Sequence, residues 1–260
     1  MRISELFGVE GKVAIVTGGS RGIGYMIAEG LVTNGVRTYI TSRKANELEP
    51  AAAELSKLGE CIAIGADLST EAGRDAFVKT YTEREDRLDI LVNNAGAAWG
   101  APLGEFPPSG FDKVLDINVK APFLLTQALL TQLKASATAE DPARVIMIGS
   151  IDGIVVPIGD NFSYSGSKAA IHMLARHLAH NVNDDNITVN TIAPGPFRSK
   201  MMGYLLDDPD SRERIARRVP RRRIGEPEDV AGAVIFLASR AGAFLTGALI
   251  PVDGGLSTHG

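Results

Sequence analysis

Cysteine is nearly absent from this sequence of 260 residues, and long apolar runs are missing altogether. The single thiol, Cys61, excludes an intramolecular disulfide framework and is typical of a reducing compartment. No segment approaches the ~18 uncharged apolar residues of a membrane span. Residues 1–10 also lack the continuous apolar core of a signal peptide. The sequence therefore predicts a cytoplasmic chain that makes no membrane contact.

An excess of basic residues is also missing, since 27 lysines and arginines face 31 aspartates and glutamates, for a formal net charge of -4. Without a definable basic face, this balance argues against a nucleic-acid partner. Three of the four histidines, His172, His177 and His180, fall on one predicted helix, with no cysteine or carboxylate at metal-ligand spacing. We therefore predict no metal site and interpret these three as packing or subunit-interface residues.

The sequence does contain a regular alternation of predicted strands and helices, without a linker, repeat or low-complexity tract. This alternation predicts an α/β fold: a single doubly wound Rossmann domain over residues 1–260, with a seven-stranded, mostly parallel sheet flanked by helices on both faces. One long helix is expected over residues 111–133. A flexible substrate lid is expected over residues 197–223, where the apolar periodicity weakens. The strands are predicted at residues 13–16, 38–41, 61–65, 88–92, 144–148, 187–192 and 248–252.

A glycine-rich segment, residues 17–24, stands between the first predicted strand and a helical stripe. Gly18 would allow a tight turn, Gly22 a close approach of backbone to a pyrophosphate, and Gly24 close packing of helix on sheet. This order of strand, turn and helix favours a dinucleotide-phosphate site over the alternative, an ordinary glycine-rich surface turn.

The ends of the next strands indicate which dinucleotide binds. The second strand ends at Ser42 and Arg43, where an acidic residue would bond a ribose 2'-hydroxyl and an arginine accommodates a 2'-phosphate. With help from Arg21, this favours NADP(H) over NAD(H); the alternative is two merely exposed arginines. Asp67 follows the third strand, where its carboxylate could meet the adenine amino group. Residues 93–96, Asn-Asn-Ala-Gly, follow the fourth, and their amides are expected to tie the central strands together and support the ribose.

Tyr164 and Lys168 stand four residues apart at the start of an apolar-periodic segment, a spacing that places both on one helix face. A fixed ammonium beside a phenol favours the ionised phenol and makes it a better acid-base catalyst. Ser150 ends the fifth strand. Because ligands in open α/β sheets bind beyond the carboxyl ends of the strands, its hydroxyl is expected across a cleft from Tyr164. The alternative for the pair is a solvated tyrosine beside a surface lysine.

Seven motifs occur in order between Lys12 and Gly255, nearly the whole chain. With them the chain resembles the short-chain dehydrogenase/reductase family, and most closely its 3-oxoacyl-acyl-carrier-protein reductase branch, which includes the reductases of rhamnolipid biosynthesis. The motifs are residues 17–24, residues 93–96, Asn118, Ser150, Tyr164-x-x-x-Lys168, Pro194-Gly195 and residues 252–255 (Val-Asp-Gly-Gly).

The resemblance implies a role for each matching residue. Tyr164 would give a proton to the substrate oxygen, Lys168 would lower the pKa of Tyr164 and hold the nicotinamide ribose, and Ser150 would bond the carbonyl. Asn118 would hold a water that relays protons, and Ser199 would bond the carboxamide where the family usually has threonine. Hydride would come from the nicotinamide. The implied cofactor-binding residues are Gly18, Ser20, Arg21, Gly22, Ile23, Gly24, Ser42, Arg43, Asp67, Leu68, Asn94, Ala95, Gly96, Tyr164, Lys168, Pro194, Gly195, Phe197 and Ser199.

The implied activity is an NADPH-dependent carbonyl reductase acting on 3-oxoacyl thioesters, in a homotetramer. Two alternatives stay open: an NADP-dependent alcohol, sugar or steroid dehydrogenase of the same family, and a non-catalytic NADP(H)-binding sensor. Where carrier-protein reductases present arginines to the acidic carrier, this chain has Asp141 and Asp185. Like charge there makes acyl carrier protein a doubtful partner and leaves a CoA thioester or a small ketone.

Two further features concern the loops around this site. The interval from Ser150 to Tyr164 is one residue longer than the commonest family spacing, a difference that a loop over residues 154–160 can absorb. The expected lid carries seven arginines, which form either a solvated helix face balanced by acidic neighbours or a site for an anionic substrate, a CoA phosphate or a carrier protein. The seven are Arg212, Arg214, Arg217, Arg218, Arg221, Arg222 and Arg223.

Overall fold

The computed structural model describes residues 2–199, 203 and 208–258. Within these residues, seven strands form one sheet in the order β3-β2-β1-β4-β5-β6-β7, and every neighbouring pair is parallel. The predicted α/β fold is confirmed, with a sheet that is parallel throughout. The strands are β1 (Val13–Thr17), β2 (Arg37–Ser42), β3 (Cys61–Gly65), β4 (Ile90–Asn93), β5 (Ala143–Ile148), β6 (Ile187–Pro194) and β7 (Leu249–Val252).

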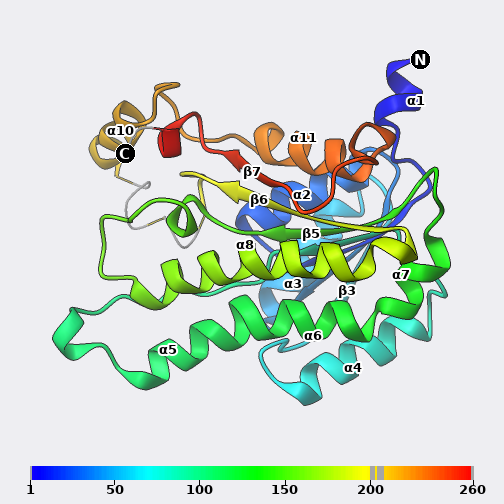
Figure 1. Ribbon diagram of the computed structural model, residues 1–260, viewed down its shortest axis with the longest axis horizontal. Coiled ribbons are helices and arrows are strands. Elements are labelled where there is room, and N and C mark those ends of the chain that lie inside the picture. Colours follow the sequence, from blue (N-terminus) through cyan, green and yellow to red (C-terminus); the bar gives the residue numbers. More distant parts are fainter. Residues whose placement is uncertain (1, 200–202, 204–207, 259–260) are drawn as a thin grey trace.

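The central strands are buried on both faces. All residues of β1, β4, β5 and β6 are buried, as expected for β-branched and apolar runs in a parallel sheet that helices cover on both sides. The strand order reverses between β1 and β4, because β2 and β3 extend to one side and β5 to β7 to the other. Open α/β sheets bind ligands beyond the carboxyl ends of the strands at such a reversal. Figure 1 shows the arrowheads of β5 and β6 pointing toward the side on which helix α10 (Pro209–Arg218) lies.

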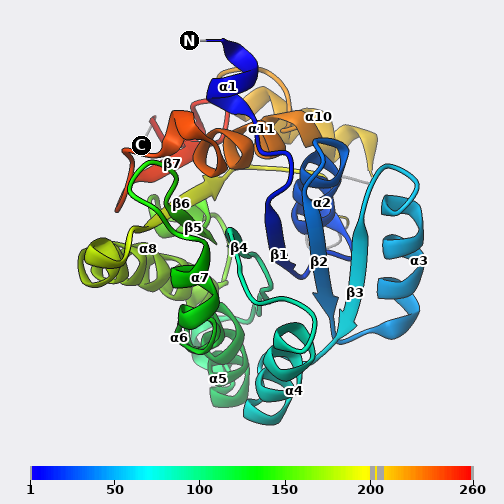
Figure 2. The same cartoon turned by 90° about the vertical axis from the view of Figure 1, so that its right-hand side faces the viewer.

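Helices cover the sheet in two layers (Figure 2). Helices α2, α3 and α11 pack on one face, around Ile27, Leu31 and Val234, and α4, α6 and α8 pack on the other, around Ile171 and Ala175. The helices of the described residues are α1 (Ile3–Phe7), α2 (Gly22–Thr33), α3 (Ala45–Leu55), α4 (Glu71–Thr82), α5 (Pro108–Leu115), α6 (Ala121–Ala128), α7 (Leu130–Ser136), α8 (Phe162–Val182), α10 (Pro209–Arg218) and α11 (Pro227–Ala238).

The single long helix predicted over residues 111–133 is wrong, because the segment is divided into three helices. A π-helical turn, η2 (Asp116–Lys120), separates α5 from α6, and Leu129 (φ -98°, ψ 9°) separates α6 from α7. Pro122 lies in the first turn of α6, where its missing N–H leaves the carbonyl of Asn118 without an α-helical donor. Apolar periodicity runs through all three pieces, so the pattern alone did not show these breaks.

The segment expected to form the lid contains one helix, α10, among its described residues, while residues 200–202 and 204–207 lie outside them. At its base Phe197 pairs with Gly225 through a parallel bridge. A Cβ atom on Gly225 would lie 2.3 Å from the Phe197 ring, so only glycine allows this ring to pack here. No helix of the described residues combines the length and the apolar character that crossing a bilayer requires.

Candidate active site

The glycine-rich loop joins the end of β1 to the start of α2. Gly18 and Gly22 have positive φ angles of 66° and 56°, which residues with side chains rarely adopt. A Cβ atom on Gly24 would lie 2.3 Å from the carbonyl oxygen of Gly18, so the helix starts in direct contact with the loop. The N–H of Gly19 donates to the carbonyl oxygen of Thr41 at 3.3 Å, and the positive end of α2 next to the loop is the part suited to an anion such as a pyrophosphate.

Asn94 and Thr17 join the carboxyl ends of β4 and β1. The side chain of Asn94 donates from Nδ2 to the carbonyl oxygen of Thr17 at 2.8 Å, and Thr17 Oγ1 accepts from the backbone N–H groups of Asn94 and Ala95, both at 2.9 Å. The prediction that these amides tie the central strands together is confirmed for Asn94, whereas Asn93 donates to Oγ1 of Thr126 in α6 at 3.2 Å. Thr17 accepts all three of these hydrogen bonds from Asn94 and Ala95, although the sequence pattern identified it only as the first residue of the glycine-rich segment.

The residues expected around the adenosine lie on one rim, where β2 and β3 end. Hydrogen bonds from the hydroxyl and N–H of Ser69, together with the charge of Arg43, lower the pKa of Asp67 although burial opposes them. The Arg43 side chain is exposed. Arg21 reaches the same rim and forms an ion pair with Glu47 of α3. Of the two guanidinium groups, Arg43 is therefore the one more available to a 2'-phosphate.

Ser150, Tyr164 and Lys168 meet beyond the carboxyl end of β5. Ser150 caps a short 3-10 helix, η3 (Ile151–Gly153), and its hydroxyl is hydrogen-bonded to the phenol of Tyr164. Nζ of Lys168 lies 5.5 Å from the centre of the Tyr164 ring and donates to the carbonyl oxygen of Ile148 at 2.8 Å. Ser150 and Lys168 are 7% and 5% exposed. The structure thus brings together the three groups that the sequence pattern indicated.

Burial, more than the neighbouring ammonium, determines the charge state of this pair. Loss of solvation raises the pKa of Tyr164 to about 12; the bond to Ser150 opposes this rise and the carboxylate of Asp152 adds to it. Loss of solvation lowers the pKa of Lys168 to about 8, and Asp152 opposes this fall. The expected lowering of the Tyr164 pKa is therefore wrong, because desolvation of the phenolate is the largest cause and the Lys168 ammonium is not among the causes of the shift. At neutral pH the phenol keeps the proton that a donor needs.

Asn118 braces the loop after β4 against α8. Its Oδ1 accepts from the N–H of Ala97 at 2.8 Å, and its Nδ2 donates to the carbonyl oxygen of Ala97 and to Oγ of Ser167, both at 2.9 Å. Both amide hydrogens are thus used, and the side chain acts as a brace. The main-chain carbonyl, whose α-helical donor is replaced by Pro122, is the group on this residue best placed to accept from a water.

Two further side chains belong to the site although no motif indicated them. His172 lies one turn after Lys168 and accepts at Nε2 from the N–H of Ser150 at 3.4 Å; burial, then the charge of Lys168, lowers the pKa of His172 to about 4. The packing interpretation is confirmed for this histidine, which is a neutral support beneath Ser150. Asp152 lies in η3, where burial raises its pKa. The sequence feature that could have indicated Asp152 as a site residue is its position two residues after Ser150. The described residues contain no group of three or more His, Cys, Asp or Glu that could hold a metal ion.

The other residues expected to bind cofactor lie around the same edge. Ser20 and Ile23 belong to the glycine-rich loop and the first turn of α2, Ser42 ends β2, and Pro194 ends β6. Gly96 follows β4, where a Cβ atom would lie 3.1 Å from Oδ1 of Asn118.

Two of the expected residues turn their side chains into the cores. Leu68 and Phe197 are 5% and 2% exposed, so only their backbones can face a ligand. Gly195 donates its N–H to the carbonyl oxygen of Val252 at 3.0 Å, which fixes the chain after β6. Ser199 lies over the glycine-rich loop, with its Cβ 3.1 Å from where a Cβ of Gly22 would be.

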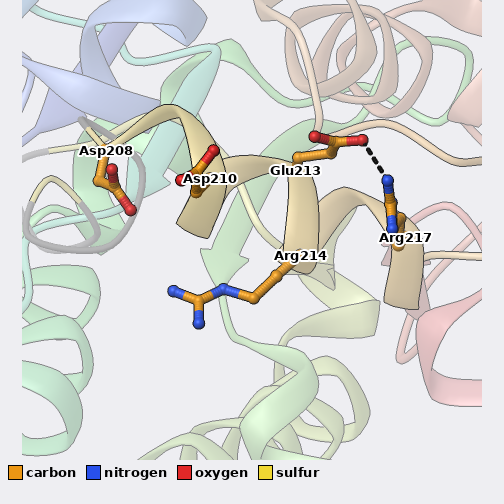
Figure 3. A pocket seen from close by; sticks show the side chains of 5 residues that line it. All are labelled: Asp208, Asp210, Glu213, Arg214 and Arg217. Atoms are coloured by element: carbon orange, nitrogen blue, oxygen red, sulfur yellow. Dashed lines mark hydrogen bonds and ion pairs between the residues drawn. The ribbon is translucent and has the colours of Figure 1, made fainter.

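Two arginines of the basic segment around α10 are paired with acidic neighbours. Arg217 forms an ion pair with Glu213 at 2.6 Å, and Arg223 forms one with Asp229 at 2.5 Å. A hollow on this helix is lined by three acidic and two basic residues that belong to α10 and the position before it (Figure 3). None of the catalytic candidates lines it, and the arrangement favours a solvated, charge-balanced helix face. The lining residues are Asp208, Asp210, Glu213, Arg214 and Arg217.

Asp141 and Asp185, whose charges argued against acyl carrier protein as a partner, form ion pairs with nearby basic side chains. Asp141 forms ion pairs with Lys12 and Arg144, and Asp185 forms one with Lys134 at 2.9 Å. Both carboxylates precede the amino-terminal ends of strands, whereas the catalytic candidates follow the carboxyl ends. The like-charge argument against acyl carrier protein therefore loses most of its force.

Known proteins share this fold and its sequence pattern. Residues 18–257 match the family model described as enoyl-(acyl carrier protein) reductase. The chain is 48% identical over 249 residues to the rhamnolipids biosynthesis 3-oxoacyl-[acyl-carrier-protein] reductase of Pseudomonas aeruginosa, covering 96% of this chain and 97% of that one. It is 32% identical to 5-keto-D-gluconate 5-reductase of Escherichia coli, over 98% of both chains.

Solved structures also superpose closely on this chain. The Pseudomonas aeruginosa RhlG/NADP active-site complex superposes with a TM-score of 0.95 at 47% identity, over 99% of this chain and 100% of that chain. A Burkholderia cenocepacia gluconate 5-dehydrogenase in complex with NADP and tartrate superposes with a TM-score of 0.90 at 28% identity, over 100% of both chains. The chain belongs to the short-chain dehydrogenase/reductase family of oxidoreductases.

Proposed function

We propose that this protein is an NADPH-dependent carbonyl reductase that converts 3-oxoacyl thioesters, linked to CoA or to acyl carrier protein, into 3-hydroxyacyl products. The observation that carries the proposal is the meeting of Ser150, Tyr164 and Lys168 next to the glycine-rich loop. The 48% identity to a 3-oxoacyl-[acyl-carrier-protein] reductase supports the substrate class. The likeness to NADP complexes supports the cofactor.

The residues that would hold NADP(H) follow the carboxyl edge of the sheet. The glycine-rich loop, residues 17–24, would hold the pyrophosphate at the start of α2. A Cβ atom on Gly18 or Gly24 would press on Asn94, so these two glycines allow the loop to keep its shape. Arg43 would take the 2'-phosphate, and Asp67 would face the adenine. When bound, the cofactor supplies the hydride, and the protein supplies position and charge.

Tyr164 would supply the proton. Its hydroxyl and that of Ser150 would both donate to the ketone oxygen, which gains negative charge as hydride arrives at the carbon. Because the Tyr164 pKa is about 12, the phenol is protonated at pH 7, which suits reduction more than oxidation. The ammonium of Lys168, 5.5 Å from the ring centre, would stabilise the phenolate left after transfer. A water on the Asn118 carbonyl would return the proton to this pair.

The substrate class is supported by an apolar rim on the two loops that follow the carboxyl ends of β4 and β5. Leu103, Val156 and Ile158 are 78%, 93% and 75% exposed. They lie on two loops that are joined by the hydrogen bond from the N–H of Ala101 to the carbonyl oxygen of Asp160, at 3.1 Å. Exposed aliphatic side chains gathered at a site mark a surface for an apolar ligand. An acyl chain fits such a rim better than a polyhydroxylated sugar acid does.

Turnover on a short panel tests this function. NADPH oxidation would be measured with acetoacetyl-CoA, a medium-chain 3-oxoacyl-CoA, its carrier-protein-linked form and 5-keto-D-gluconate. We expect kcat/KM to rise from acetoacetyl to the medium-chain thioesters, and 5-keto-D-gluconate to be inert. Reduction of the sugar acid with no turnover of any thioester would overturn the substrate class. Tight NADPH binding without turnover of any ketone would favour a sensor.

We also propose that residues 1–260 form one domain that assembles as a cytoplasmic homotetramer. The proposal is supported by apolar side chains that are exposed outside the catalytic edge, among them Phe244 on the loop before β7 and Met173 on α8. Light scattering should then give about four times the chain mass of 27.5 kDa. A monomeric mass would refute the assembly.

A further inference from the structure

One side-chain hydrogen bond closes the base of the loop that links the two catalytic hydroxyl groups. Oδ2 of Asp152 accepts from Nδ2 of Asn161 at 3.1 Å. Between them, residues 154–160 are mostly exposed, so this bond fastens the points at which the loop leaves and rejoins the site. The other amide atom of Asn161, Oδ1, is buried and has no partner among the described residues. Asp152 is therefore the side-chain anchor of this amide.

The bond belongs to a closed ring of hydrogen bonds that includes both hydroxyl groups. The N–H of Asp152 donates to Oγ of Ser150 at 3.1 Å. On the other side, Asn161 caps α8, and its carbonyl oxygen accepts from the N–H of Tyr164 at 2.9 Å. The bond between the hydroxyls of Ser150 and Tyr164 completes the ring. A shift at Asp152 is thus transmitted to both reacting groups through at most two bonds.

The helical turn η3 also packs directly on the turn of α8 that carries Lys168. A Cβ atom on Gly153 would lie 2.6 Å from the carbonyl carbon of Lys168 and 2.7 Å from the backbone nitrogen of Ala169. No side chain separates the two backbones here. This contact holds the neighbouring carboxylate of Asp152 in a fixed place relative to the ammonium.

Among the described residues, the titratable groups whose charges act on Asp152 or respond to it are on α8. They are Tyr164 and Lys168, with His172 close by, since its imidazole would touch a Cβ on Gly153 at 2.7 Å. The negative charge of Asp152 raises the pKa of Tyr164 and that of Lys168, whereas His172 is neutral at pH 7. The carboxylate therefore favours the protonated form of both catalytic groups, the form that reduction consumes.

We propose that Asp152 is a positioning residue of the reductase: its carboxylate fastens α8 to the end of β5 through Asn161 and so sets the placement of Tyr164 against Ser150. The inference rests on the proposed carbonyl reduction. A misplacement of reacting groups by about 1 Å can cost about 100-fold in rate. The longer interval between the two hydroxyls makes such a fastening useful, because a longer loop alone holds its ends less firmly.

Three variants separate the effect of the hydrogen bond between Asp152 and Asn161 from the effect of the negative charge of Asp152. Asp152→Ala removes both, Asn161→Ala removes the bond and keeps the carboxylate, and Asp152→Asn keeps an acceptor oxygen and removes the charge. Asp160→Asn, at an exposed carboxylate in the same loop, is the matched control. Each would be compared with wild type for kcat and KM on acetoacetyl-CoA, for NADPH affinity by fluorescence, and for Tm.

We expect kcat to fall about 10- to 100-fold in Asp152→Ala and in Asn161→Ala, with NADPH affinity within about twofold of wild type. The double alanine variant should be no slower than the slower single variant, because both remove the same bond. Asp160→Asn should match wild type. Wild-type kcat in either alanine variant, or additive losses in the double variant, would overturn the proposal. Losses of kcat, NADPH affinity and Tm in parallel would also overturn it, because they would show a general support of the fold.

Asp152→Asn tests the charge through the pH profile. Without the carboxylate, the pKa values of Tyr164 and Lys168 both fall, so the alkaline decline of kcat should move to lower pH by on the order of 1 unit, with a near-normal kcat at the optimum. An unmoved alkaline limb would overturn the charge contribution. Failure of the proposed function would be seen separately, because the wild-type protein would then turn over no thioester. In that case the same variants would be compared on whichever ketone the wild-type protein reduces.

Discussion

Two buried cations lie at opposite ends of β5. The difference between their surroundings separates a structural group from a catalytic one. Arg144 at the amino end is 1% exposed and donates to the carbonyl oxygens of Leu237 and Ser239 and to the carboxylate of Asp141. Lys168 at the carboxyl end is 5% exposed, and among the described residues its one hydrogen-bond partner is the carbonyl oxygen of Ile148.

Both cations leave N–H groups without a partner among the described residues, since Nη1 of Arg144 is also buried and unbonded, so the catalytic cation is distinguished by its place beside the Tyr164 ring. Three bonds from Arg144 compensate much of its desolvation, so it fastens α11 to the sheet. Lys168 has three N–H donors and one bond, and burial lowers its pKa from 10.5 to about 8. Among the exposed arginines, Arg217 is ion-paired with Glu213, whereas Arg43 lies at the rim expected to bind the adenosine.

Replacing Lys168 should give the largest loss of activity. In Lys168→Met we expect kcat to fall about 1,000-fold, because no charge then stabilises the phenolate of Tyr164. The folded-state pKa lies below the unfolded one, so the ammonium destabilises the fold at all pH values below about 8, by about 3 kcal/mol at pH 7. The methionine variant should thus unfold with equal or higher free energy in urea. A large loss of stability would place Lys168 with Arg144 and break the comparison.

Replacing Arg144 should do the opposite. In Arg144→Met two buried carbonyl groups lose their donors, and we expect the free energy of unfolding to fall by about 3 kcal/mol or more. Per folded molecule, kcat should stay within about twofold of wild type, because the site lies at the other end of β5. The measurement is urea denaturation with activity normalised to the folded fraction. A selective loss of kcat with normal stability would contradict the assignment.

Arg43 extends the comparison to an exposed cation. In Arg43→Asp we expect KM for NADPH to rise about 10- to 100-fold, since a charge-assisted bond to phosphate is lost and repulsion replaces it. KM for NADH should change little or fall. Arg21→Ala is the matched variant, with a smaller expected rise because Arg21 already pairs with Glu47. If the preference for NADPH over NADH survives in Arg43→Asp, the interpretation of the β2 end is incorrect.

The smallest effect is expected on α10. Charge reversal of Arg217 and Arg218 to glutamate should change KM for an acyl-CoA and for a small uncharged ketone equally, by less than about twofold, because exposed ion pairs contribute little. A selective rise in KM for acyl-CoA would instead show that this basic segment recognises an anion, and would revive the sharper of the two interpretations.

Much of the site was readable in the sequence because its chemistry depends on local spacing. The interval of four between Tyr164 and Lys168 on a helix, the glycines of residues 17–24 and the arginine at the end of β2 each have a physical meaning that neighbouring residues reveal. The π-helical turn that contains Asn118 could not be predicted from the sequence. Pro122 in a continuous apolar pattern is compatible with a straight helix, a kink or a break.

The sequence by itself determined the alternating α/β architecture and the phosphate loop, because these follow from periodicity and short-range spacing, and its resemblance to the family implied the reacting hydroxyls and ammonium. Only the tertiary structure decided the charge state of Tyr164 and the partners of Asp152 and His172. Desolvation depends on atoms brought from distant elements, and no spacing in the chain encodes how much water they exclude. The pKa of the proton donor is therefore a property of the packed site and not of the motif that contains it.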